Sequence, residues 1–133
     1  MQASGLHIAT AAGEVAVLGK GLENATSVAF VLRSSPAGPV FTLSLKIPGY
    51  LGWLRLSPDG QRLAAVDQYR TVTTFDTTTG QRLPTCDSDG LRTCWDLGWL
   101  DRDHLVGIGT KGFRGEPDAE ERIVLWDANS GRV

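Results

Sequence analysis

The two histidines, His7 and His104, are the first residues to consider for acid–base chemistry. A catalytic site would need one of them beside a nucleophile and a third group that orients it. The strand pattern described below places His7 in the first unit of the chain and His104 at the start of a strand in the last unit, so nothing brings them together. His104 ends the turn sequence DRDH, and we expect a solvated turn residue with acidic neighbours. The sequence predicts no catalytic residue.

Two Asp-x-Asp pairs could offer carboxylate oxygens to a hard cation such as Ca²⁺. They are Asp87 with Asp89 and Asp101 with Asp103. Neither pair continues into a loop with a glycine and a distal glutamate at the required distance, so turn capping is the favoured interpretation. The stretch VGIGTKGFRG around Ile108 lacks the complete spacing of a phosphate-binding loop and opens no evident helix. We therefore expect neither a metal nor a cofactor.

Cys86 and Cys94 enclose the short polar segment DSDGLRT. A turn at residues 88–90 would bring their Cα atoms to the roughly 5.5 Å that a disulfide requires. Two reduced thiols beside a loop are the favoured alternative, because cytosolic chains seldom keep disulfides. Two sulfurs without neighbouring histidines do not complete a zinc site.

Composition excludes some classes of partner. The 133 residues include 13 basic and 15 acidic side chains, a net charge of −2, so no overall positive field attracts nucleic acid or an anionic membrane. No run approaches the ~18 apolar residues of a membrane-spanning helix, and the first residues lack the pattern of a signal peptide. We expect a cytoplasmic protein.

Sixteen glycines and six prolines lie between short apolar runs, as in an all-β chain with tight turns. The most regular unit is LGWLRLSPDGQRLAAVDQYRTVTTFDTTTGQRL, in which the apolar side chains of Leu54, Leu56, Leu63 and Ala65 can share one face. Residues 19–24 are predicted as a turn, and Pro84 is tolerable only in an outer strand. The expected strands cover residues 6–10, 14–18, 27–32 and 40–47, then 52–56, 62–66, 71–75 and 81–86, and finally 94–100, 104–110 and 122–126.

The units repeat. The pairs Leu32-Arg33, Phe75-Asp76 and Trp126-Asp127 are followed by SSPAG, TTTG and ANSG, and they recur at intervals of roughly 40 to 50 residues. An aspartate after a strand accepts hydrogen bonds from backbone N–H groups two or three residues on, and a glycine supplies a positive φ. The residues expected to form these turns are Pro58, Asp59, Gly60, Phe75, Asp76, Gly80, Trp126, Asp127 and Gly131.

On these motifs the chain resembles WD-repeat β-propellers, from about Leu6 to its end; SPDG before an apolar strand also occurs in TolB-like and YVTN-like propellers. The resemblance implies an all-β propeller segment of about three four-stranded antiparallel blades, residues 6–50, 51–93 and 94–133, the last without its outer strand. The Gly-His pair of WD repeats is absent, since Gly49-Tyr50 and Gly90-Leu91 stand in its place. Degenerate repeats of this kind are typical of bacterial examples.

Fewer than three complete blades cannot close a ring that typically needs about four to eight. We therefore expect part of a larger propeller, because an open stack exposes an apolar face at each end. The resemblance implies a noncatalytic protein-interaction or sensor scaffold of a signalling or assembly protein. Two alternatives stay open: the gating propeller of a peptidase or other enzyme whose catalytic domain is outside this chain, and a propeller fragment that self-assembles.

The expected partner is a protein, the remaining blades or a second copy of the chain. By the resemblance, the polar insertion at residues 111–121 lies on the rim where propellers bind partners, and it also fits a polar excursion without a partner. Of the four tryptophans, Trp53, Trp99 and Trp126 are assigned to packing between blades. The predicted partner-binding residues are Phe113 and Arg114 as anchors, with Lys111, Glu116 and the more exposed Trp95.

Overall fold

The computed structural model describes residues 6–11, 15–22, 26–48, 51–67, 71–87, 91–111, 117 and 120–133. These residues form strands and turns without a helix, which confirms the all-β prediction. Accordingly, no helix in this part of the chain is long and apolar enough to cross a membrane. The strands are β1 (Leu6–Ala11), β2 (Val15–Leu22), β3 (Thr26–Arg33), β4 (Val40–Pro48), β5 (Leu51–Leu56), β6 (Arg62–Asp67), β7 (Val72–Asp76), β8 (Leu91–Trp99), β9 (His104–Lys111) and β10 (Glu120–Asp127).

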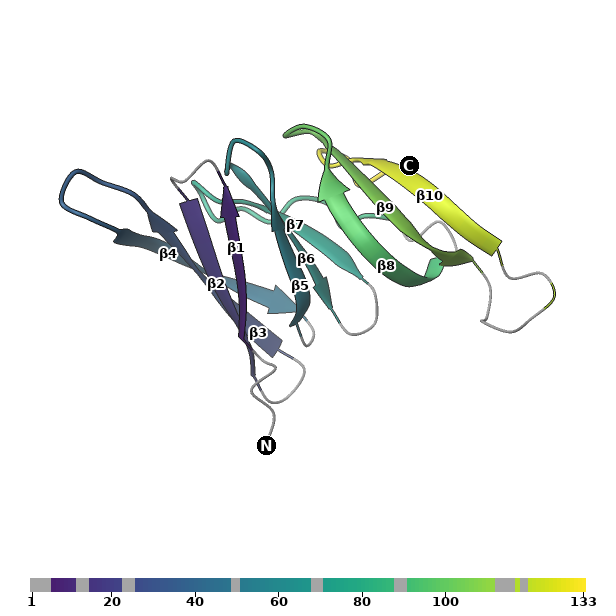
Figure 1. Cartoon of the computed structure of the whole chain (residues 1–133), viewed down its shortest axis with the longest axis horizontal. Helices are drawn as coiled ribbons and strands as arrows, with labels where there is room; N and C mark the ends of the chain where they lie inside the picture. The colour runs from purple at the N-terminus through teal and green to yellow at the C-terminus, as the bar shows by residue number, and fades with distance from the viewer. Residues whose placement is uncertain are drawn as a thin grey trace.

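The strands form three antiparallel meanders. Sheet A has the order β1-β2-β3-β4, sheet B the order β5-β6-β7, and sheet C the order β8-β9-β10. Figure 1 shows sheet B between the other two, with β4 and β10 at opposite ends of the molecule. Consecutive strands pair by short connections, so every sheet comes from one continuous stretch of chain.

The strand register shows that the three sheets are copies of one unit. The first residue of the second strand pairs with the last residue of the third strand in every sheet. These pairs are Val15 with Arg33, Arg62 with Asp76 and His104 with Asp127. The dipeptides that define the sequence repeat therefore occupy the same position in each sheet.

Two apolar cores hold the sheets together. Side chains alternate between the faces of β6, so Leu63 and Ala65 point into a core against sheet A, while Ala64 and Val66 point into a core against sheet C. Leu54 joins the first core, as the alternating pattern predicts. The first core contains Val15, Val17, Ala29, Val31, Leu45, Ile47, Leu51, Leu54, Leu63, Ala65 and Phe75. The second contains Ala64, Val66, Val72, Cys86, Leu97, Leu105, Val124 and Trp126.

The turns that follow β7 and β10 each lie on the outer edge of the preceding sheet. Gly80 lies against Leu43 and Leu45 of β4. Gly131 lies against the backbone of Thr85, and the Asp87 amide donates a hydrogen bond of 2.8 Å to the Gly131 carbonyl. Sheet C is therefore placed against sheet B in the same way as sheet B is placed against sheet A.

Two strand predictions in sheets A and B need correction. Residues 81–86 were expected to form a complete outer strand of sheet B, but they make one isolated bridge, between Phe75 and Arg82. The Leu83 and Cys86 amides still donate to β7, while Pro84 between them has no N–H to offer. The expected turn at residues 19–24 is also wrong at its start, because β2 continues to Leu22 and pairs with β3 along its length.

Strand β8 begins at Leu91, ahead of the expected start at Cys94. Its pairing with β9 shifts register between Leu91 and Thr93 and again between Cys94 and Asp96. Such bulges add residues to one strand of a pair, which accounts for the greater length of β8.

The close contact of Gly131 with the backbone of Thr85 gives a stability prediction. Gly131 has a φ of 74°, and an added Cβ would collide with the Thr85 carbonyl, whereas Gly38 has a φ of 112° and open space around it. Backbone strain alone costs about 1–3 kcal/mol at either position. We therefore expect Gly131→Ala to lower the free energy of unfolding in urea by more than Gly38→Ala. Equal losses in the two variants would contradict this packing of sheet C on sheet B.

Candidate functional site

The turns that follow β7 and β10 share one hydrogen-bond pattern. The Asp76 carboxylate accepts from the amides of Thr78 and Thr79 at 2.8 and 3.0 Å. The Asp127 carboxylate accepts hydrogen bonds from the backbone amides of Asn129 and Ser130 at 2.8 and 3.3 Å. Gly80 closes the first turn with a φ of 79°. These bonds are the ones that the Asp-x-x-x-Gly pattern predicts, and they fix both turns as rigid supports.

The turns before β6 and β9 are also related. The Asp59 carboxylate accepts from the Ser57 hydroxyl at 2.6 Å and the Gln61 amide at 3.0 Å. Partial burial raises the pKa of Asp59, but these hydrogen bonds outweigh that effect and the net pKa is lowered. The Asp101 carboxylate accepts from the Asp103 amide at 2.8 Å in the corresponding turn. Asp59 and Asp101 therefore act as turn caps.

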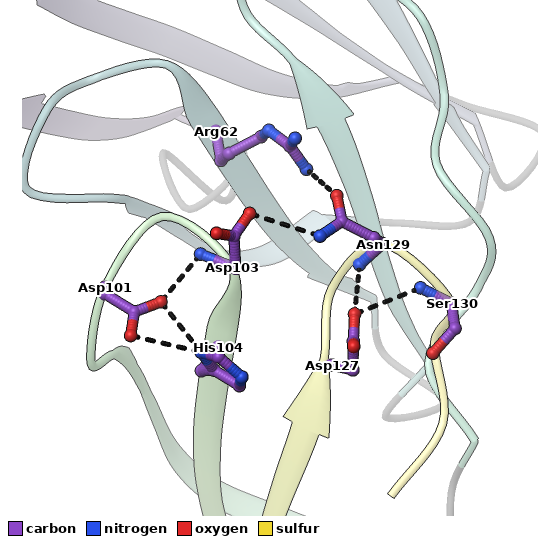
Figure 2. A network of polar contacts seen from close by, with 7 residues as sticks. All are labelled: Arg62, Asp101, Asp103, His104, Asp127, Asn129 and Ser130. Atoms are coloured by element: carbon purple, nitrogen blue, oxygen red, sulfur yellow. Dashed lines mark hydrogen bonds and ion pairs between the residues drawn. The ribbon is translucent and has the colours of Figure 1, made fainter.

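A polar network joins the turns of sheets B and C (Figure 2). Arg62, only 7% exposed, donates from Nη1 to Oδ1 of Asn129 at 3.1 Å. The Asn129 amide nitrogen donates in turn to Oδ1 of Asp103 at 3.1 Å. A buried guanidinium is costly without partners, so the hydrogen bond from Arg62 to Asn129 favours this placement of sheet C on sheet B. Sheet A makes a comparable contact, since Arg33 donates to the hydroxyl groups of Thr77 and Thr78.

His104 occupies in sheet C the position that Arg62 holds in sheet B, as their register partners show. Its Nδ1 lies 2.9 Å from Oδ1 and 3.1 Å from Oδ2 of Asp101, as Figure 2 shows. The hydrogen bond and the charge of Asp101 raise the pKa of His104, with smaller contributions from Asp127 and Asp103. The imidazole is thus held by acidic turn residues, as the sequence predicts.

The face of sheet C that points away from sheet B is apolar. We call it the outer face of sheet C and define it by Val106, Ile108, Ile123 and Leu125. Ile123 is 74% exposed and Leu125 is 47% exposed. A shallow groove of about 290 Å³ runs along it and is lined by Asp96, Leu97, Gly98, Val106, Gly107, Ile108 and Ile123. Its size and aliphatic lining suit side chains of a protein surface.

The sequence predicts an exposed apolar face at each end of the open stack, but it did not identify the residues that form this one. Residues 104–110 and 122–126 are apolar at successive positions, so both of their faces are apolar. Strands of that kind are normally covered on both sides. In sheet C, sheet B covers only the face that carries Leu105, Val124 and Trp126. The two-sided pattern was the signal that could have identified the outer face.

The residues predicted to bind a partner are mostly outside the described part of the chain. Phe113, Arg114 and Glu116 lie there, as does the side chain of Trp95. Asp89, from the carboxylate pair considered for a cation, also lies outside the described residues. Lys111 ends β9, half-buried, and pairs with Glu120 of β10. The insertion therefore begins at the end of sheet C that is farther from the turn network (Figure 1).

The structure shows where three of the tryptophans and one of the cysteines lie. Trp126 is buried in the second core and Trp53 and Trp99 pack against it, which confirms their packing role. The Trp99 indole also donates to the Arg55 carbonyl of sheet B at 2.9 Å. Cys86 is a free thiol in the same core, and burial raises its pKa to about 12. It is therefore a packing residue with little thiolate at neutral pH.

Comparison with known proteins supports the fold. No protein-family model matches the sequence, and no curated protein matches it. The acylaminoacyl peptidase of Pyrococcus horikoshii resembles the structure with a TM-score of 0.59 and 13% identity, over 92% of this chain and 23% of that one. Sqt1 of Saccharomyces cerevisiae, a WD40 protein, gives a TM-score of 0.56 and 13% identity, over 96% and 37%.

Both structures are of propeller type, so this chain has a β-propeller-like fold. The chain spans well under half of either protein. At 13% identity, the likeness extends to the fold alone.

The His104–Asp101 pair gives a testable pH dependence. We expect the imidazole of His104 to titrate by NMR with a midpoint above the ordinary value of about 6.5. Because its pKa is raised in the folded protein, the pair stabilises the fold fully below that ordinary value, and the contribution is lost as pH rises through the folded pKa. Asp101→Asn should lower the midpoint, whereas Asp59→Asn should leave it unchanged. An unchanged midpoint in Asp101→Asn would refute the assignment.

Proposed function

We propose that this chain is a noncatalytic protein-binding scaffold of the β-propeller type. The observation that carries the proposal is the outer face of sheet C. It is equivalent to the face of sheet B on which sheet C packs, so its geometry already suits a protein surface. The carboxylates of Asp59, Asp76, Asp101 and Asp127 each cap their own turn, and this structural role supports a scaffold over a catalytic centre.

The outer face has the composition of a protein contact. Burying an exposed Val, Leu, Ile or comparable side chain is worth about 1.5–3 kcal/mol. Burial of Ile123 and Leu125 by a partner would contribute the most binding free energy, because these two side chains are the more exposed ones of the outer face of sheet C. His104 and Asp127 lie at one end of this face and can make polar contacts at its rim.

The insertion at residues 111–121 is a second proposed contact. It starts at Lys111, where β9 leaves the sheet that carries the outer face. Phe113 and Arg114 are its proposed anchors, because aromatic and arginine side chains dominate the binding energy of many interfaces. Glu116 and Trp95 are proposed as supporting contacts.

A substrate-selecting propeller of a peptidase is the second candidate, favoured by the likeness to the Pyrococcus horikoshii acylaminoacyl peptidase. Hydrolysis would then depend on a catalytic domain carried elsewhere in the full protein. A peptide-amide hydrolysis assay on the natural full-length protein separates the candidates. Hydrolysis sensitive to a serine-directed inhibitor would favour the peptidase, and none is expected for the scaffold.

The scaffold is tested with Ile123→Glu/Leu125→Glu and the matched control Leu100→Glu. Leu100 is 63% exposed but lies in the turn before β9. Partners captured by cross-linking with the wild type would be purified and their affinities measured by interferometry. We expect the double variant to bind at least about tenfold more weakly, corresponding to about 1.4 kcal/mol, and Leu100→Glu to bind like the wild type. Equal affinities for all three proteins would refute the outer face as the binding surface.

A further inference from the structure

The outer face of sheet A is the second uncovered apolar surface of the molecule. We define it by Ile8, Phe30, Leu32 and Phe41. Ile8 is 66%, Phe41 57% and Phe30 38% exposed. The Phe30 and Phe41 rings lie 6.1 Å apart between centroids. Sheets A and C are at opposite ends of the stack, so the two outer faces point away from each other (Figure 1).

The outer face of sheet C corresponds to the face of sheet B that already carries another sheet. Arg62 and His104 hold equivalent positions, and the residues two and four places later correspond as well. Ala64 and Val66 of sheet B belong to the core shared with sheet C. Val106 and Ile108 are therefore at the positions that would contact a following sheet.

The outer face of sheet A corresponds to the opposite side of the same interface. Leu32 pairs with Ala16, just as Phe75 pairs with Leu63 and Trp126 pairs with Leu105. Phe75 enters the core against sheet A, and Trp126 enters the core against sheet B. Leu32 is thus the residue that would enter a core against a preceding sheet.

We propose that the outer face of sheet C binds the outer face of sheet A in a second copy of this chain. One polypeptide carries both halves of the interface that it uses twice internally, and the intermolecular contact continues that interface. This inference rests on the proposed function, because it names the occupant of the same surface.

The turns extend the correspondence. Arg62 reaches Asn129 in the turn of the following sheet. In the second copy, the turn after β3 takes that place, and Ser35 is the residue equivalent to Asn129. His104, in the position of Arg62, is a suitable donor to the Ser35 hydroxyl. The contact joins two different surfaces, so it is of the head-to-tail kind, which either closes a ring or extends into a filament.

Sedimentation velocity over a concentration series tests the self-association. We expect the wild type to approach twice its mass of 14.3 kDa. Leu125→Glu damages only the face on sheet C, and Phe30→Glu damages only the face on sheet A. Each variant alone should stay monomeric, while Leu100→Glu should dimerise like the wild type.

Mixing the two variants tests the head-to-tail arrangement. Phe30→Glu keeps an intact sheet C face and Leu125→Glu keeps an intact sheet A face, so an equimolar mixture should recover one contact and form dimers. Two symmetric arrangements are excluded in the same experiment, because a contact between two sheet C faces would let Phe30→Glu dimerise alone, and one between two sheet A faces would do so for Leu125→Glu. Either result would overturn the proposal.

A measurement on the wild type covers the case in which a variant does not fold. Hydrogen exchange in β3 and β10 should slow as the protein concentration rises, while exchange in β6 should not change. A wild type that stays monomeric up to about 100 µM, with concentration-independent exchange, overturns self-association. If such a monomer still loses a different partner on Leu125→Glu, the scaffold function stands and only the second copy is rejected.

Discussion

The packing of one sheet against the next is the interaction on which the rest of the structure depends. A three-stranded or four-stranded meander has two apolar faces and cannot bury either alone. Sheet B is stable in this setting because Leu63 and Phe75 are covered by sheet A, while Ala64 and Val66 are covered by sheet C. The turns carrying Gly80 and Gly131 fix the position of each sheet on the edge of its predecessor.

This dependence explains why the turn residues recur with such regularity. An aspartate that caps its own turn makes the backbone rigid without using a partner from another sheet, so the turn presents the same shape at each step. The contacts beyond that shape vary: Arg33 reaches two threonine hydroxyls, and Arg62 reaches Asn129. The shared backbone sets the geometry, and the varied side chains adjust each interface to its neighbours.

Much of the fold could be predicted because its signals are local. Asp76 with Gly80 and Asp127 with Gly131 encode their turns within five residues, and alternation at Leu54 and Leu63 assigns a face. The incomplete outer strand of sheet B was harder to predict from the sequence. Pro84 interrupts its hydrogen bonding to β7, although the amides of Leu83 and Cys86 on either side still donate to that strand.

The candidate site depended on longer-range information. The residues of β9 and β10 are equally apolar on both faces, and only the arrangement of sheets shows that Ile123 and Leu125 are left uncovered. The local sequence around His104 correctly indicated a solvated turn. Its equivalence to the buried Arg62 emerged only from the register of paired strands.

The central claim is that the same kind of packing interface joins sheet A to sheet B and sheet B to sheet C. Sheet B is therefore covered on both faces, whereas sheets A and C are each covered by sheet B on one face. Site-resolved hydrogen exchange of the dilute protein tests it most directly, because protection follows local stability. We predict the slowest exchange at the amides of β6 that are hydrogen-bonded within sheet B, and faster exchange at the equivalent amides of β9. Equal protection of β6 and β9, or faster exchange in β6, would contradict the stacked arrangement.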